Sequence, residues 1–325
     1  MKRSFALILC IVLALSTVLV GCSSKPATLK FGFGVYTTAP AVTNATADKD
    51  GSGKLDITFA AVTVDADGKI VGCALDTASN SVAFTAEGKA VAANEFKTKY
   101  ELGKDYNMVA YGGSTKEWYE QADAFETVVA GKTLDEVKGL VGEDKKGNDD
   151  VINAGCTIMI NEFVGAIEKA YNAAADSNVT AEDVLKVTAA TEQTCADATA
   201  DKDGSNKVST TVFGAAVDAD GKVVAAASDC VELDFTFDTK GACTLDTTKA
   251  VTSKKEAGSN YGMVAYGNAE KEWFEQAAAF DAACVGKTAT EIAGLIAEDG
   301  KGVAELQTAG CTIYVTGFVK AASKI

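Results

Sequence analysis

The stretch KLDITFAAVTVDADGKIVGCALD, residues 54–76, contains two β-prone runs on either side of an Asp-Gly turn. Branched and aromatic residues are frequent in residues 54–64, and residues 69–76 form a second run of similar character. Asp-Gly between two such runs is typical of a tight β-hairpin. The turn VDADGK occurs at residues 64–69 and again at residues 217–222. We therefore predict the same antiparallel hairpin twice in this chain.

The repetition extends well beyond the hairpin. YNMVAYGGSTKEWYEQADAF, residues 106–125, matches YGMVAYGNAEKEWFEQAAAF, residues 261–280, and AGCTI occurs at residues 154–158 and 309–313. The offset is 153 at the hairpin and 155 in these later segments, so a two-residue insertion separates the copies. This period is too long for a solenoid repeat and suits a domain. We predict two tandem homologous domains, residues 31–172 and 183–325, joined by a linker at residues 173–182.

Helical patterns follow the hairpin in each copy. In the first copy, one helix face carries apolar residues at helical spacing: Trp118, Ala122, Phe125 and Val129. Ser114 with Glu117 is the expected capping box of this helix, and Asn268 is the expected N-cap of its counterpart. Thr133 with Glu136, and Thr288 with Glu291, are expected to cap short second helices. These patterns predict that GKT, at residues 131–133 and 286–288, ends one helix and begins the next.

The last part of each copy carries CTIMI or CTIYV, which predicts a strand, and EFVGAIEKAY in the first copy predicts a closing helix. Strands that come first and helices that come later indicate an α+β fold. We expect each domain to be an antiparallel, hairpin-rich sheet packed with helices.

The first residues, MKRSFALILCIVLALSTVLVGCSSK, have the pattern of a secretory leader. The segment Leu19-Val20-Gly21-Cys22 resembles the bacterial lipobox. That resemblance implies a lipoprotein signal peptide at residues 1–21, lipid on the sulfur of Cys22, and a spacer at residues 22–30. The chain would then be anchored on the outer face of the cell membrane. A plain signal peptide is the alternative.

Composition excludes several classes of function. The chain has a formal charge of −15, and removal of the two leader cations makes it −17, which disfavours nucleic acid as a partner. It contains no histidine, which removes Ser-His and Cys-His catalysis and histidine metal ligands. Nine cysteines are present without a Cys-x-x-Cys spacing. We interpret most of the seven beyond Cys22 as small buried apolar residues.

Two further motifs resemble known binding loops, but each lacks a residue that such a loop needs. DKDGSGKLD, residues 48–56, resembles the start of an EF-hand loop, but Phe59 stands where the loop needs its last glutamate. GKT lacks the earlier glycine of a P-loop, because Glu126 and Asp281 occupy that position. We expect no metal site and no nucleotide-phosphate loop here.

Aromatic residues and methionine recur in the loop-like YNMVAYGG and YGMVAYGN segments: Tyr106, Met108 and Tyr111, with Tyr261, Met263 and Tyr266 in the second copy. Such side chains on loops could line a flat apolar ligand pocket, and simple packing is the alternative.

At AGCT the sequence resembles the FMN-binding domain family, which carries flavin on a threonine that follows a glycine and a small residue. Thr157 and Thr312 are similar to that acceptor. The order of motifs resembles more closely the PplA-like, two-domain flavinylated surface lipoproteins of extracellular electron transfer in Gram-positive bacteria. That resemblance rests on the lipobox, the tandem copies, TKYELG (residues 98–103), KEW-x-EQ and GKT. It implies two covalent FMN groups, an ApbE-type flavin transferase, a membrane quinol-linked donor and extracellular electron acceptors.

The residues around the threonines suit that chemistry. Threonine supplies the alcohol that a phosphoester needs, and Gly155 and Gly310 allow a phosphate to approach the backbone closely. Cys156 and Cys311 lie beside the acceptors, but no histidine exists to activate them, so apolar packing is the better interpretation. A buried strand of small residues is the alternative interpretation of AGCTI.

We therefore expect an electron carrier without turnover chemistry of its own, because the acids and lysines form no recognisable acid–base constellation. A module that binds flavin, quinone or another small ligand without a covalent bond is one alternative. A purely structural or adhesive surface protein is the other.

Overall fold

The computed structural model describes residues 27–325. The predicted signal peptide, the lipid attachment at Cys22 and most of the predicted spacer lie outside the described residues. Within residues 27–325, no helix is both long enough and apolar enough to cross a bilayer.

The first sheet is antiparallel, of order β5-β4-β3-β1-β6 with β2 paired to β3, and the first repeat supplies all of its strands except β6, which lies in the segment between the repeats. Its long central hairpin is the predicted one, and the DADGK turn joins its two strands. The strands are β1 (Lys30–Thr37), β2 (Ala41–Thr43), β3 (Gly51–Val64), β4 (Ile70–Phe84), β5 (Ala90–Val91) and β6 (Ala175–Asp176).

The second repeat forms an antiparallel sheet of order β10-β9-β8-β7. The hairpin bulges at the same place in both repeats, between Thr63 and Val64 and between Ala216 and Val217. The strands are β7 (Val184–Ala196), β8 (Gly204–Val217), β9 (Val223–Phe237) and β10 (Cys243–Thr244). The hairpin prediction is therefore confirmed in both copies, whereas strands β1 and β7 were not predicted.

Helices follow the strands in each repeat. The first repeat has α1 (Lys99–Leu102), the 3₁₀ helix η1 (Gly103–Tyr106), α2 (Trp118–Val129), α3 (Leu134–Lys138), α4 (Asp149–Ala154) and α5 (Asn161–Asn172). The second has α6 (Lys254–Ala257), the 3₁₀ helix η2 (Gly258–Tyr261), α7 (Met263–Gly267), α8 (Trp273–Cys284), α9 (Ala289–Ala293), α10 (Ala304–Thr308) and α11 (Thr316–Ala322). Capping boxes of Thr133 with Glu136 and of Thr288 with Glu291 begin α3 and α9, as predicted.

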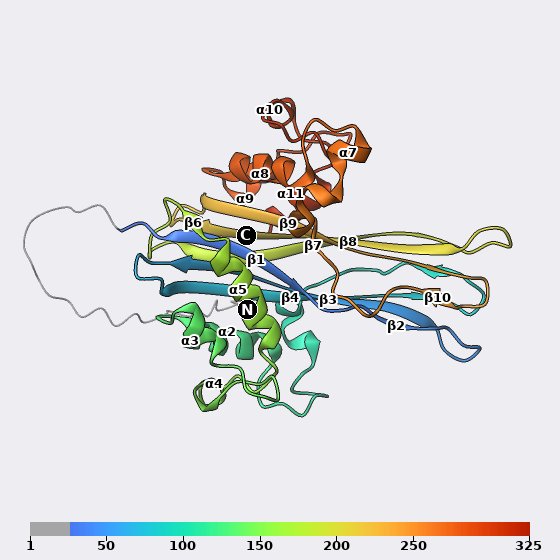
Figure 1. Cartoon of the computed structure of the whole chain (residues 1–325), viewed down its shortest axis with the longest axis horizontal. Coiled ribbons are helices and arrows are strands. Elements are labelled where there is room, and N and C mark those ends of the chain that lie inside the picture. Colours follow the sequence, from blue (N-terminus) through green and yellow to red (C-terminus); the bar gives the residue numbers. More distant parts are fainter. Residues whose placement is uncertain (1–26) are drawn as a thin grey trace, which may run out of the picture.

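The two sheets pack face to face, with the helices of each repeat on the outer face of its own sheet (Figure 1). Strand β3 is apolar on both faces: Phe59 and Ala61 enter the core between the sheets, and Ala60 and Val62 enter the core beneath the helices. Both faces are covered, which explains why this strand lacks an alternation of polar and apolar residues. The protein is thus a mixed fold of antiparallel sheets and helices, in agreement with the predicted class.

The core between the sheets draws on both repeats. Phe84 on β4 stacks on Phe237 on β9, with ring centroids 4.6 Å apart. The segment between the repeats also takes part, since β6 pairs with β1 and Val179 is fully buried in this shared core. The division into two separate domains with a linker at residues 173–182 stays a prediction.

Two local predictions were wrong. Residues 155–160 and 310–315 form irregular connections between helices. Each has one isolated bridge in place of a strand ladder, between Lys146 and Met159 and between Lys301 and Tyr314. Cys156 and Ile160 are buried while Thr157 and Met159 are exposed, so the alternation resembles a strand although no neighbouring strand is present.

The predicted caps of α2 and α8 were also wrong. These helices begin after Glu117 and Glu272, which form capping boxes with Glu120 and Glu275. The same two carboxylates accept backbone N–H groups of the preceding loop, and these hydrogen bonds hold the loop at the start of the helix.

Candidate functional site

The predicted acceptor threonines occupy the same position in both repeats. Thr157 follows α4, and the backbone turns at Gly155, whose φ of +106° favours glycine. Thr312 follows α10 and Gly310, whose φ is +104°. Both threonines are exposed, whereas the preceding Cys156 and Cys311 are fully buried.

A buried glutamine on the main helix holds each threonine. Gln121 on α2 accepts hydrogen bonds from the backbone N–H of Thr157 at 2.8 Å and from its hydroxyl at 3.0 Å. Gln276 on α8 accepts the equivalent bonds from Thr312 at 2.9 and 3.0 Å. The hydroxyl oxygen is therefore fixed in place although the side chain is open to solvent.

The same helices hold the loops that carry the predicted aromatic residues and methionines. The side-chain N–H₂ of Gln121 donates to the sulfur of Met108 at 3.2 Å. Glu117 accepts the backbone N–H of Met108 at 2.9 Å, and Glu272 accepts that of Met263 at the same distance. In each repeat, one helix therefore holds both the loop that carries the methionine and the segment that carries the threonine.

A cavity of about 500 Å³ opens beside Thr157 in the first repeat, between the sheet and its helices. Its apolar walls come from the predicted loop and from α2 and α5, and two cations and two acids lie among the lining residues. The lining is Asp56, Thr77, Lys99, Tyr106, Met108, Trp118, Lys146, Thr157, Ile158, Met159, Glu162 and Phe163.

The second repeat has the matching cavity, with a volume of about 580 Å³. Tyr261 and Met263 line it, together with Ile313, the residue directly after Thr312. The remaining lining residues are Glu192, Ser209, Thr211, Cys230, Lys254, Trp273, Tyr314, Thr316, Gly317 and Phe318. Because each cavity lies beneath its own helices, the two open on opposite sides of the double sheet.

Each cavity contains a lysine above two aromatic rings. The ammonium of Lys99 lies 5.5 Å from the ring centroid of Tyr106 and 5.6 Å from that of Trp118. Lys254 lies 4.9 Å from the Tyr261 centroid, and it also forms an ion pair with Glu232 at 2.9 Å. These contacts place a lysine ammonium against the aromatic rings that line each cavity.

The hairpins behind the two cavities differ in which strand carries the acid. In the first repeat, Asp56 on β3 lines the cavity and accepts a hydrogen bond from Ser79 on β4. In the second, Ser209 on β8 lines the cavity and donates at 3.0 Å to Glu232 on β9, which is not itself a lining residue. The acid has moved to the facing strand, so the two sites are related but have different charge arrangements.

The structure brings most predicted site residues together. Thr157, Tyr106 and Met108 line one cavity, and Tyr261 and Met263 line the other beside Thr312. Tyr111 and Tyr266 point away, with exposed fractions of 87% and 89%. Cys156 and Cys311 lie in the core, where burial raises the pKa of both thiols to about 11, so both are neutral near pH 7.

Sequence analysis did not single out Gln121, Gln276, Lys99, Lys254 or the role of the two tryptophans. A signal was present, because a glutamine recurs on the apolar face of the main helix in both copies. Buried polar side chains need partners, so a repeated glutamine on that face indicates a specific hydrogen bond.

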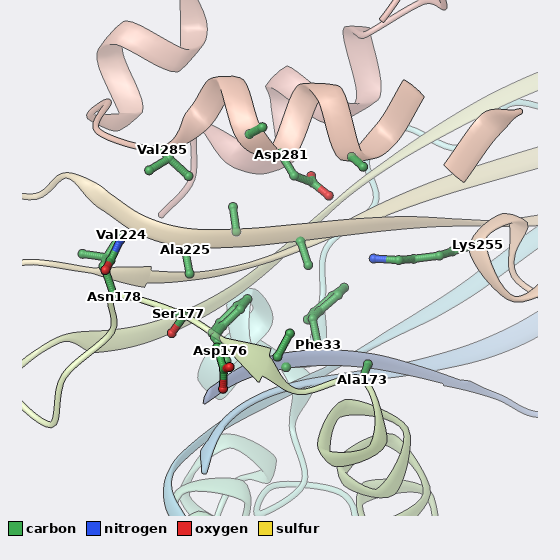
Figure 2. A pocket seen from close by; sticks show the side chains of 17 residues that line it. Phe33, Ala173, Asp176, Ser177, Asn178, Val224, Ala225, Lys255, Asp281 and Val285 are labelled. Carbon is green, nitrogen blue, oxygen red and sulfur yellow. The ribbon is translucent and has the colours of Figure 1, made fainter. Parts of the chain in front are cut away.

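A third cavity, about 520 Å³, lies between the repeats (Figure 2). Strand β1 and residues 173–178 form one side, and β9 and α8 form the other. Phe33, Lys255 and Asp281 line it, and none of the predicted site residues does. Within the described part of the chain, no cluster of three or more Cys, Asp or Glu side chains is arranged to hold a metal ion.

No family model, curated protein or solved structure matches this chain.

Proposed function

We propose that this protein is an electron carrier with FMN attached covalently to Thr157 and Thr312, one in each FMN-binding-like repeat. The observation that carries the proposal is an exposed threonine whose hydroxyl is held by a buried glutamine beside an aromatic cavity, found twice in one chain. Lipid on Cys22 would anchor the carrier on the outer face of the membrane, where it would pass electrons from a quinol-linked donor to extracellular acceptors.

The cavities fit such a group. Their volumes of about 500 and 580 Å³ lie in the range of small-molecule sites. In the first cavity, Tyr106 and Trp118 offer apolar ring surfaces, and Lys99 supplies a cation. In the second, Tyr261, Trp273 and Lys254 are the equivalent groups. FMN would supply the electron-transfer chemistry that the side chains of this chain lack.

The threonine acts as a substrate of a transferase in this proposal. Its hydroxyl oxygen forms a bond to the flavin phosphorus of a flavin dinucleotide, and the bond from that phosphorus to the leaving nucleotide breaks. The hydroxyl proton goes to a base of the transferase, because Gln121 and Gln276 are neutral amides that accept the hydrogen bond of the hydroxyl but do not take up its proton. After attachment, the backbone N–H of each threonine still has its glutamine partner, and the segment keeps its position.

Intact mass measurement of the full chain, co-expressed with an ApbE-type flavin transferase, tests the proposal. We expect the mass of two FMN groups, each less one water. Thr157→Val and Thr312→Val should each remove one group, and the double variant should remove both. Thr127→Val, at an exposed threonine on α2, is the matched control.

A wild-type chain without added flavin, or a double variant with unchanged loading, would contradict the proposal. A yellow chain that loses its colour on denaturation and filtration would instead support non-covalent binding of flavin. A colourless chain from its native host would favour a structural role.

A further inference from the structure

A lysine lies against the glycine that precedes each acceptor threonine. A Cβ added to Gly155 would lie 2.0 Å from Nζ of Lys116, and one added to Gly310 would lie 2.1 Å from Nζ of Lys271. The ammonium groups are therefore packed on the backbone two residues before Thr157 and Thr312. The same arrangement in both repeats indicates a shared role.

The glutamine that holds the threonine also holds the lysine. The amide of Gln121 accepts from Thr157 through its oxygen, and its nitrogen donates to the backbone carbonyl of Lys116 at 3.2 Å. In the second repeat, Gln276 donates to the carbonyl of Lys271 at 3.0 Å. The backbone carbonyl of the lysine and the threonine thus bind opposite ends of one amide group.

The two ammonium groups have little other compensation. Within residues 27–325, neither Lys116 nor Lys271 has a carboxylate within 4.0 Å. Lys116 donates to the carbonyl of Ala154 at 3.4 Å, which leaves further donors of the ammonium for another acceptor. In a chain with a formal charge of −15, such a cation two residues before the acceptor threonine favours an anion at that place.

We propose that Lys116 and Lys271 bind the phosphate that is joined to Thr157 and Thr312. This inference rests on the proposed function and adds to it the residues that balance the charge of the ester. The phosphoester keeps one negative charge after attachment, and its free oxygens accept charge-assisted hydrogen bonds from the lysine ammonium. The absence of a side chain at Gly155 and Gly310 leaves room for the ammonium two residues before each threonine.

A structural role is the competing explanation for the lysines. A cation at the C-terminal end of a helix can bind its last carbonyls, and Ala154 is the last residue of α4. Such a role would affect the stability of the chain with or without flavin. Binding of the phosphate would affect only the flavin-loaded chain and the rate at which it is loaded.

The test uses the full chain in the Thr312→Val background, so that only the first site is loaded. Lys116→Met should slow flavin incorporation by a purified transferase about tenfold, as expected for the loss of one charge-assisted hydrogen bond. It should also reduce the gain in Tm that loading produces and remove the salt dependence of that gain. Lys116→Arg should restore both, and Lys132→Met, in the GKT turn, is the control.

The outcomes separate the two proposals. If Thr157→Val does not abolish loading, the proposed function fails. If Thr157→Val abolishes loading and Lys116→Met changes neither the rate nor the gain in Tm, only the lysine inference is overturned. A slower rate with an unchanged gain in Tm would place Lys116 in contact with the transferase instead and would also overturn it. Lys271→Met in the Thr157→Val background repeats the test in the second repeat.

Discussion

Gln121 accepts both the backbone N–H and the hydroxyl of Thr157, a residue 36 positions later in the chain. The bond to the hydroxyl orients its oxygen, and the bond to the N–H fixes the backbone that carries it. Gln276 and Thr312 repeat this relationship, also across 36 positions.

Replacing Gln121 with leucine should slow flavin incorporation at Thr157 and leave Thr312 unaffected. The substitution removes the acceptor of two hydrogen bonds and should lower the free energy of unfolding by about 1 kcal/mol. Site-resolved mass spectrometry of peptides checks the loading, and urea denaturation checks the stability. Thr127→Ala on the same helix should change neither quantity, and equal loss of flavin at both threonines would contradict the expectation.

Replacing Glu117 with alanine should lower the free energy of unfolding by about 1–3 kcal/mol. The carboxylate caps α2 and also accepts the N–H groups of Met108 and Val109, so the loop loses its attachment to the helix. Urea denaturation measures the loss. Glu143→Ala, in an exposed loop, should leave stability nearly unchanged, and a similar effect of both variants would show that Glu117 has no special role.

Stability should fall as pH rises from about 4 to about 8. Burial raises the pKa of Asp76 to about 7 and of Glu126 to about 8, and the charges of Asp123 and Asp76 further disfavour ionisation of Glu126. Burial also raises the pKa of Asp281 to about 6. Because these pKa values are raised in the folded state, the folded chain binds more protons than the unfolded chain over this range of pH. The free energy of unfolding therefore falls as the pH rises and the protons leave.

Glu126→Gln should reduce this pH dependence by an amount on the order of 2 kcal/mol, because glutamine keeps an acceptor for the N–H of Leu75 and does not titrate. Urea denaturation at pH 5 and pH 8 measures the difference. Glu143→Gln in the exposed loop controls for the general repulsion in this acidic chain. An identical slope in the Glu126→Gln variant and in the wild type would rule out this group as the cause.

Gly155→Ala and Gly131→Ala should destabilise the protein by similar amounts, about 1–2 kcal/mol, since both glycines have positive φ. Only Gly155 lies against Lys116, whose flexible end would move aside. We therefore expect slower flavin loading for Gly155→Ala alone, measured by mass spectrometry over time. Equal rates of flavin loading in both variants would show that the position of the Lys116 ammonium does not affect loading.

Phe237→Ala should lower the free energy of unfolding by about 3–5 kcal/mol, because the ring is almost fully buried and stacks on Phe84 of the other repeat. The whole chain should still unfold in one transition, since both sheets share that core. Circular dichroism and tryptophan fluorescence during urea denaturation check this. Tyr266→Ala, at an exposed ring, should cost little, and two separate transitions would show independent repeats.

An isolated second repeat, residues 183–325, should not form a stable monomer. Removal of the first repeat exposes the apolar inner face of β8 and β9, which includes Val212, Val231 and Phe235. Size-exclusion chromatography and near-UV circular dichroism of this fragment give the answer. A compact, cooperatively folding monomer would support the division into two separate domains.

The sequence by itself determined the repeats, the central hairpins, the main helices and the position of the candidate threonines. These features depend on interactions between near neighbours: an Asp-Gly turn between β-prone runs, apolar residues at helical spacing, and Thr-Glu capping boxes. Internal repetition strengthened the prediction of each feature, because a pattern that occurs in both copies arises by chance less often than one that occurs once.

Only the tertiary structure decided how these parts meet. The sheets pack face to face and share a core, β1 and β7 complete them, and the AGCTI segment forms a connection between helices. The glutamines and lysines that hold each threonine region come from a distant helix or the turn before it. Such contacts join residues far apart in the chain, and their formation depends on the packing of whole elements, which local periodicity does not encode.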